Sequence, residues 1–546
     1  MSELFNSRYT RTIFLAVGLG MACYVLAEDV RLYSSVDPTV TATPLKKAPD
    51  AQARAEASWQ EDFAAARPPI RAFLLKAQDA DKIEDPLARC LQMPDLPDNH
   101  WPAGLAQAHC QFVHGPRITR EQVAGLVQRG AFAELDKRFA ADLNRHFSDQ
   151  EFSEVIHRDY DAFDSSYEAG RDSKIWLEKA PRSAFALAAR GVFYRAQAKA
   201  ARGTASADAT PPENFARMHE YADKAVEMYR GALRIEPRLM PAYTGLIDLG
   251  TLDSRDELRA EGFAGAHRAD PDCISVNLYL MRSLQPRWGG SYAAMRELAT
   301  AMASHVDRRP LLALLTHAAE VEAGKQLVRD SEFSSAVATL VPVLGKTTDP
   351  DALQYSAISQ QSLEQGDKWL ALMYLMEASR FADNINLNTN LGHLLINFPH
   401  RLDWGVKFLK RASDENPDDG QAHMELGIAY RMLNDIVRAD EEFRLAARDP
   451  EQHTAALEYL VSQLQYEKKW KEALEFSDAL IQVDPSSATA WQTRYELLKA
   501  MQDPRAPEAL RKFFAVVNRS NATERAIAEA YERQLANAQK QTPPRP

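Results

Sequence analysis

Hydrophobic positions recur three and four residues apart along most of this chain, whereas the strict alternation of a half-buried strand is almost absent. The stretch from Gly420 to Asp449 shows the pattern most clearly, as two amphipathic segments separated by Asn434-Asp435. Small residues in such segments let two helices approach closely, and large residues fill the space that remains. The pattern therefore predicts a tightly packed helical hairpin. Its small and large positions are Leu426, Gly427 and Tyr430 in the first helix and Ala439, Phe443 and Ala446 in the second.

This hairpin pattern repeats along the chain with a constant period of about 34 residues. A hairpin of this kind cannot bury its apolar face alone, so a fixed period predicts a stack of neighbouring hairpins. Repeats in register begin at Ala352, Asn386, Gly420, Thr454 and Ala488, and the small position of the second helix falls on Ala371, Gly405, Ala439 and Ala473. In a separate array, Ala225, Tyr229, Ala232 and Pro237 recur one period later as Arg259, Phe263, Ala266 and Pro271.

The order of small and large positions resembles the tetratricopeptide repeat. That resemblance implies an all-α solenoid with a concave groove lined by the first helix of each pair. Two further phrases, ALAARGVFYRAQAKAARG at 186–203 and LQPRWGGSYAAM at 284–295, resemble an uncharacterised bacterial family built on helical repeats, with a turn at Trp288-Gly289-Gly290-Ser291. The second resemblance covers residues 134–300. It implies a bacterial origin and attaches no reaction.

These patterns predict an all-α, tetratricopeptide-like solenoid in two blocks behind an N-terminal membrane segment. The expected order is a signal-anchor segment at 1–27, an extended proline-containing linker at 28–57, an N-terminal helical region at 58–180, a first repeat block at 181–310, a second block at 311–520, and a capping helix with a tail at 521–546.

The N-terminal segment combines an apolar run with asymmetric charge. Thr12 to Ala27 is apolar, Arg8 and Arg11 precede it, and acidic residues follow at once. Positive charge on the N-terminal side predicts a single-pass anchor in the bacterial inner membrane, with the bulk of the chain in the periplasm. Val25-Leu26-Ala27 also fits a cleavage site, so secretion into the periplasm after cleavage is the alternative.

The balance of acidic and basic residues bears on whether the chain binds nucleic acid. The chain has 76 acidic and 65 basic residues, a net charge of −11, and no long Lys/Arg run. Because a nucleic-acid backbone would be repelled overall, nucleic acid is not expected as a partner. With 45% hydrophobic and 26% charged residues, the composition is that of an ordinary globular chain.

Cys90 and Cys110 flank a proline-rich stretch, and an exported protein would favour a disulfide between them. Two buried free thiols are the alternative. His100, His109 and His114 make this the densest group of metal-ligating residue types, but the spacing matches no recurrent zinc pattern. We therefore expect neither a metal nor a cofactor.

No motif carries a recognisable reaction. Gly289-Gly290-Ser291 lacks the flanking glycine and the strand of a hydrolase elbow, and its simpler interpretation is a tight turn. Four residues after His219 stands Asp223, where a zinc protease needs histidine. The sequence predicts a protein that is not an enzyme.

The first helices of the second block keep several side chains that packing does not use. Amides, one arginine and apolar residues suit an extended peptide or a partner helix. Met424 and Ile428 stand where a carboxylate-clamping groove would need lysine or asparagine. The alternative is a groove filled by the N-terminal segment of the same chain. The predicted groove residues are Asn390, Leu394, Asn397, Gln421, Met424, Ile428, Arg431, Glu458, Ser462 and Gln465.

The functional hypothesis is a membrane-anchored, periplasm-facing scaffold that recruits a protein or peptide partner. Two alternatives remain open at this stage. One is a cell-envelope enzyme with its site in residues 58–180, which predicts a deep pocket with convergent ionisable groups there. The other is an assembly or holding factor for exported proteins.

Overall fold

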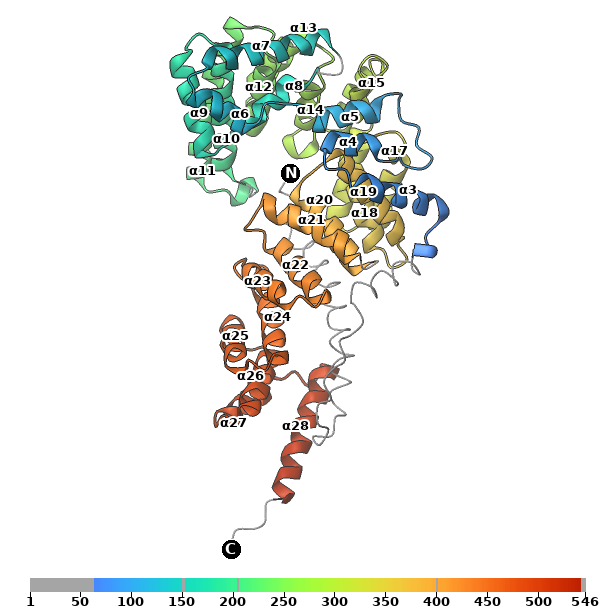
Figure 1. Cartoon of the computed structure of the whole chain (residues 1–546), viewed down its shortest axis with the longest axis vertical. Coiled ribbons are helices and arrows are strands. Elements are labelled where there is room, and N and C mark those ends of the chain that lie inside the picture. The colour runs from blue at the N-terminus through green and yellow to red at the C-terminus, as the bar shows by residue number, and fades with distance from the viewer. Residues whose placement is uncertain (1–62, 150–152, 204–205, 399–400, 542–546) are drawn as a thin grey trace. The chain divides into compact units, whose positions relative to one another are not determined.

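The computed structural model describes residues 63–149, 153–203, 206–398 and 401–541. Every regular element in these ranges is a helix, which confirms the predicted all-α class for that part of the chain (Figure 1). No helix within the same ranges is both long and apolar enough to span a membrane. The predicted membrane segment at 12–27 and the linker at 28–57 lie outside the described residues.

Contacts between helices divide the described chain into two compact units. The first unit is built on residues 65–383 and the second on residues 384–541. The sequence pattern instead placed the change of block at residues 310–311. The helices between residues 318 and 381 belong to the first unit because the last of them packs against three helices near the N-terminus.

Helices of between 5 and 17 residues open the described part of the first unit. Phe139 and Trp176 are fully buried with ring centroids 5.3 Å apart, and they anchor the core of this region. Thr119 and Gln122 form a capping box that fixes where one helix begins. The helices are α3 (Pro68–Ala80), α4 (Pro86–Gln92), α5 (Leu105–His114), α6 (Arg120–Gln128), α7 (Phe132–Ser148), α8 (Val155–Asp159) and α9 (Tyr167–Lys179).

Five helix pairs complete the first unit. Tyr229 is fully buried between them, and its ring occupies the space that side chains at Gly191 and Gly245 would need. The pairs are α10 (Ala184–Arg202) with α11 (Pro212–Ile235), α12 (Met240–Leu252) with α13 (Asp256–Ala269), α14 (Ile274–Ser283) with α15 (Tyr292–Ala303), α16 (Ala318–Arg329) with α17 (Phe333–Leu344), and α18 (Pro350–Ser362) with α19 (Lys368–Phe381). Short 3₁₀ turns lie at Tyr160–Ala162, Ala207–Ala209, Pro286–Trp288 and Pro310–Leu314.

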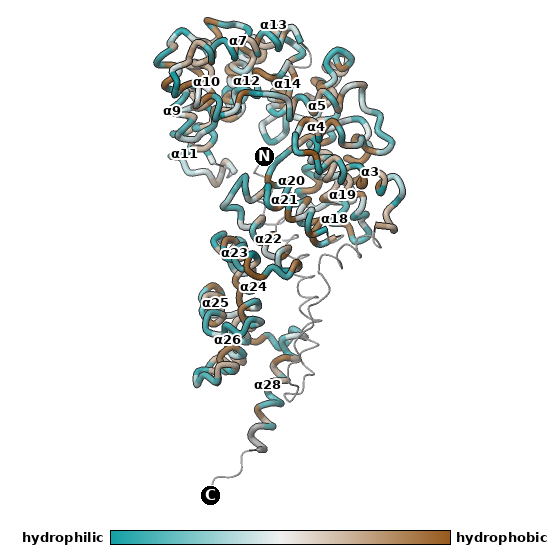
Figure 2. The backbone as a smooth tube through the Cα atoms, in the orientation of Figure 1, coloured by the Kyte–Doolittle hydropathy of each residue, from teal (hydrophilic) through white to brown (hydrophobic). Residues whose placement is uncertain are grey.

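The second unit consists of four helix pairs and a final helix. Each helix carries both hydrophobic and hydrophilic residues, as the mixed colours along the tube in Figure 2 show. From α18 onward the first helices begin at Pro350, Ile385, Gly420, His453 and Ala488, which follows the period of the sequence pattern. The pairs are α20 (Ile385–Asn397) with α21 (Leu402–Glu415), α22 (Gly420–Met432) with α23 (Ile436–Ala446), α24 (His453–Tyr466) with α25 (Trp470–Val483), and α26 (Ala488–Ala500) with α27 (Ala506–Val516), followed by α28 (Ala522–Gln541).

One turn geometry closes several of these pairs. A non-glycine residue with positive φ ends the first helix, and the next residue donates its amide to the carbonyl five positions earlier. This is the Schellman arrangement, which satisfies carbonyls left unpaired at a helix end. The residues with positive φ are Ser254, Ser331, Asn434, Lys468 and Gln502, and the last three follow one another at the period of the sequence pattern. The turn at Asn434-Asp435 that the sequence predicts is one of them.

Small residues bring the two helices of a pair together, as the pattern at Gly420–Asp449 indicates. A Cβ atom added at Gly427 would lie 2.5 Å from the ring of Phe443 on the facing helix. Ala439 and Ala473, the small positions of successive second helices, are fully buried. At the end of the chain, α28 buries Ala528 and Tyr531 in one cluster with Phe513 of α27. That packing gives the last pair a covered outer face.

Candidate functional sites

The predicted groove residues divide into a buried and an exposed set. Asn390, Leu394 and Met424 are 4%, 4% and 6% exposed, so the packing between helices encloses them and a partner has little of them to contact. The others keep exposed surface. This partly exposed set, called here the first-helix face, comprises Asn397, Gln421, Ile428, Arg431, Glu458, Ser462 and Gln465.

Polar side chains connect successive first helices of the second unit. His393 of α20 lies 2.7 Å from Glu425 of α22, and Gln421 donates to the same carboxylate oxygen at 2.9 Å. Gln452, the residue that caps the start of α24, donates to Gln421 at 2.9 Å. Burial alone would lower the pKa of His393, but Glu425 raises it overall. These contacts link α20, α22 and α24. Some of the polar side chains predicted to line the groove therefore hold neighbouring repeats together.

Arg431 and Glu425 each retain a polar atom without a hydrogen-bond partner. The Arg431 guanidinium lies 5.5 Å from the ring centroid of Tyr459 on α24, and its Nη1 atom has no acceptor. The second oxygen of Glu425 has no donor. Both atoms are buried, where an unsatisfied polar group is costly.

The cysteine and histidine group of the N-terminal region is used for packing. Cys90 and Cys110 are joined by a disulfide, in contact with the buried ring of Phe381. His109 stacks on that ring with centroids 4.5 Å apart and bonds Thr348 at 2.8 Å. Burial lowers the pKa of His109 to about 3, so its imidazole is neutral. The two sulfurs are therefore not available as thiolate ligands.

A pocket of about 490 Å³ lies in the first unit between the start of α3, the loop after α4, and helices α17 and α19. Its ionisable lining residues are Arg67, Asp98, His100, Lys346 and Tyr374. Arg67 is paired with Asp367 at 2.9 Å.

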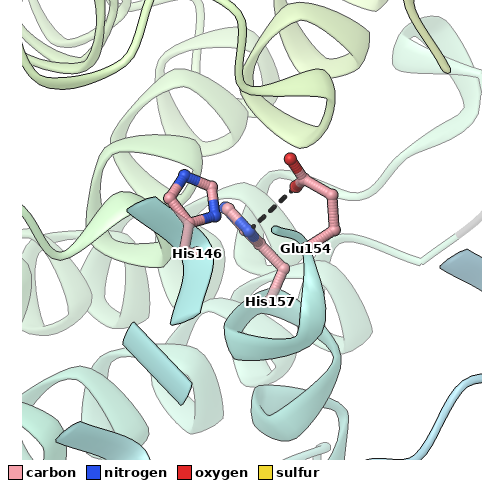
Figure 3. A group of neighbouring side chains, drawn as sticks. All are labelled: His146, Glu154 and His157. Atoms are coloured by element: carbon pink, nitrogen blue, oxygen red, sulfur yellow. Dashed lines mark ion pairs between the residues drawn. The ribbon is translucent and has the colours of Figure 1, made fainter. Parts of the chain in front are cut away.

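A second group of ligand-type side chains was missed from the sequence. His146 at the end of α7, Glu154 just before α8, and His157 on α8 place their nitrogen and oxygen atoms within 4.8 Å of one another. Figure 3 shows the three side chains converging, with the ion pair between His157 and Glu154 drawn as a dashed line. The signal in the sequence was Glu154-x-x-His157, which places both residues on one side of a helical turn.

Surrounding groups hold this cluster in place. Glu154 accepts hydrogen bonds from the Ser275 hydroxyl at 2.7 Å and from the amide of Ile274 at 3.2 Å, at the N-terminus of α14. Burial alone would raise the pKa of Glu154, but attraction to both histidines and the Ser275 bond hold it at about 2. The carboxylate is therefore ionised, and the positive end of a helix stabilises it.

Comparison with known proteins yields only distant structural likenesses. No protein family and no curated protein matches the sequence. A solved structure of PilF from Pseudomonas aeruginosa is 16% identical in sequence, with a TM-score of 0.33. The match covers 40% of this chain and 97% of the PilF chain. The APC/C hetero-tetramer Cut9–Hcn1 contains a chain that is 11% identical, covering 87% of this chain and 98% of its own, with a TM-score of 0.32. At TM-scores this low, neither likeness carries an argument about this chain.

Proposed function

We propose that this chain is a protein–protein interaction scaffold whose second unit binds an extended peptide or a partner helix along its first helices. The observation that carries the proposal is the first-helix face, where partly exposed polar and apolar side chains recur from one pair to the next. A bound peptide supplies both amide donors and carbonyl acceptors. Arg431, which is partly exposed on α22, offers a guanidinium donor for such carbonyls.

The proposal places this scaffold at the bacterial inner membrane, with both units in the periplasm and residues 12–27 as the anchor. The charge asymmetry around that apolar run supports the orientation. The Cys90–Cys110 disulfide also supports it, because disulfides persist in oxidising compartments. Protease added outside spheroplasts is expected to degrade both units, and protection of the units contradicts the placement.

The binding proposal is tested by changing only partly exposed positions of the first-helix face. In the full chain, Ile428→Asp combined with Arg431→Glu removes one apolar contact and reverses one charge. Crosslinking in native membranes, with partners identified by mass spectrometry, is expected to show recovery reduced about tenfold or more, as for loss of central contact residues. The matched control is Glu441→Lys with Arg448→Glu, at exposed positions in and just after the second helix of the same pair.

Both variants must keep the circular dichroism and thermal midpoint of the wild-type chain, which separates lost binding from lost folding. Recovery that is unchanged in the first-helix variant contradicts the proposal. An equal loss in the control also contradicts it, because the partner would then not distinguish the two helices of the pair.

A further inference from the structure

The buried cluster of His146, Glu154 and His157 has nitrogen atoms that the protein does not use. The His146 side chain is fully buried and that of His157 is 9% exposed. Nδ1 of His146 and both ring nitrogens of His157 have no hydrogen-bond partner. Although His157 Nδ1 lies 3.2 Å from a Glu154 oxygen, the contact lacks hydrogen-bond geometry. Buried polar atoms are almost always satisfied, so three such atoms at one place point to a missing ligand.

The hydrogen bond of the other ring nitrogen of His146, Nε2, shows that Nδ1 is the atom able to bind a ligand. Nε2 lies 3.1 Å from Asp270 Oδ2. A carboxylate oxygen accepts hydrogen bonds, so the imidazole proton resides on Nε2. The lone pair of His146 is then on Nδ1, the atom without a partner. A carboxylate behind a ligand histidine is the usual support in metal sites.

We propose that His146, Glu154 and His157 bind one divalent transition-metal ion, for which zinc is the fitting probe. Two imidazoles and one carboxylate are a set that zinc and similar ions take, with further positions left open. Bonds of about 2.1 Å place tetrahedral ligand atoms about 3.4 Å apart, so ligand atoms that now lie within 4.8 Å of one another need to close in by up to about 1.4 Å. Hard ions such as Mg²⁺ and Ca²⁺ prefer all-oxygen sites and are not expected to bind.

The site lies where three parts of the first unit meet. His146 belongs to the last turn of α7, Glu154 immediately precedes α8, and His157 lies on α8. Glu154 also accepts from the first amide of α14. A pocket of about 30 Å³, lined by Ser153, Glu154 and Arg158 among others, adjoins the cluster and is large enough for a water-sized species. A bound ion would link α7 to α8 and α14, so its role is to stabilise the folded first unit.

The test uses the full chain, purified without a histidine tag, stripped with a chelator and dialysed against zinc. Elemental analysis is expected to give one zinc per chain, and His146→Gln with His157→Gln is expected to reduce the bound zinc to background. His109→Gln, a buried histidine outside the cluster, is the matched control and should keep the full equivalent. Excess Mg²⁺ or Ca²⁺ should not displace the zinc.

A second variant, which changes none of the three ligands, separates loss of zinc binding from loss of folding. Asp270→Asn leaves all three ligands in place and is expected to weaken zinc binding about 10- to 100-fold. Zinc should also raise the thermal midpoint of the wild-type chain and not that of the double histidine variant. The absence of bound zinc in the wild-type chain overturns the proposal. Equal zinc in wild-type chain and double variant overturns it as well, because the ion would then lie elsewhere.

Discussion

At the scale of single residues, the turns within helix pairs hold side chains in an unfavourable backbone region. Lys468 has a φ of 60°, a conformation that costs a residue with a Cβ atom about 1–2 kcal/mol compared with its normal regions. The Schellman hydrogen bonds of the turn hold the residue there. The pair α24–α25 therefore carries strain that glycine would not.

Lys468→Gly should accordingly stabilise the second unit by about 1 kcal/mol, because glycine adopts positive φ without steric cost. Chemical denaturation of the full chain measures the change. Lys471→Gly, three residues later in the first turn of α25, is the control and should destabilise by about 1 kcal/mol, the usual cost of glycine in a helix. If both substitutions act in the same direction, the strain argument is wrong.

Gly427 is required for a different reason, which is space. Because a Cβ atom there would meet the Phe443 ring at 2.5 Å, Gly427→Ala should destabilise the second unit by about 1–3 kcal/mol. In a Phe443→Leu background the same substitution should cost less, since the smaller side chain leaves room. A double-mutant cycle on denaturation midpoints measures this coupling, and additive costs would contradict a direct clash.

At the scale of helices, two histidine–carboxylate pairs join neighbouring elements of the second unit. His393 links α20 to α22, and His423 links α22 to α23 through Glu442 at 2.6 Å. The bond to Glu442 raises the pKa of His423, as the Glu425 pair does for His393. Each pair is an ionic contact only while the imidazole is protonated.

The sign of the pH dependence follows from these raised pKa values. Stabilisation from each histidine is full below its unfolded pKa of about 6.5 and is lost as the pH rises through the higher folded value. The second unit should therefore lose stability over the interval from about pH 6.5 upward. The free energy of unfolding of the wild-type chain is compared at each pH with that of the variant carrying both His393→Gln and His423→Gln. The difference isolates the two histidines, because titrating groups elsewhere affect both chains equally. A wild-type stability that rises relative to the variant over this interval contradicts the assignment.

At the scale of the whole molecule, the disulfide joins α4 to α5 at the start of the first unit, and this bridged pair packs against α19, its last helix. Cys90 accompanies Cys110 and Phe381 in one buried cluster, and Arg380 donates to the Cys90 carbonyl at 2.8 Å. The bridge closes a loop of 20 residues. It therefore restricts the unfolded chain in a region where the helices are short.

Replacement of both cysteines, Cys90→Ala with Cys110→Ala, should cost the first unit about 3 kcal/mol on the loop-entropy relation. Thermal denaturation of the full chain measures the loss. Reductant should add the mass of two hydrogen atoms to the unfolded wild-type chain and nothing to the variant. An intact mass that reductant leaves unchanged in the wild-type chain would show that the bridge is absent in solution.

The helices and their repetition follow from the order of residues along the chain. The spacing of Leu426, Gly427, Ala439 and Phe443 is a local property, because positions three and four residues apart share a helix face whatever surrounds them. The constant period follows from the same local rule applied repeatedly, and it reappears in the positions of the Asn434, Lys468 and Gln502 turns.

The tertiary structure alone decided which of these side chains remain accessible and which distant ones meet. Leu394 and Met424 have the helical positions of groove residues, yet neighbouring repeats enclose them, and no local pattern records that neighbour. His146 meets Asp270 across 124 positions of sequence. Contacts between residues so far apart in sequence arise from the packing of whole helices. The sequence therefore shows the residue types, but only the fold shows that the two side chains meet.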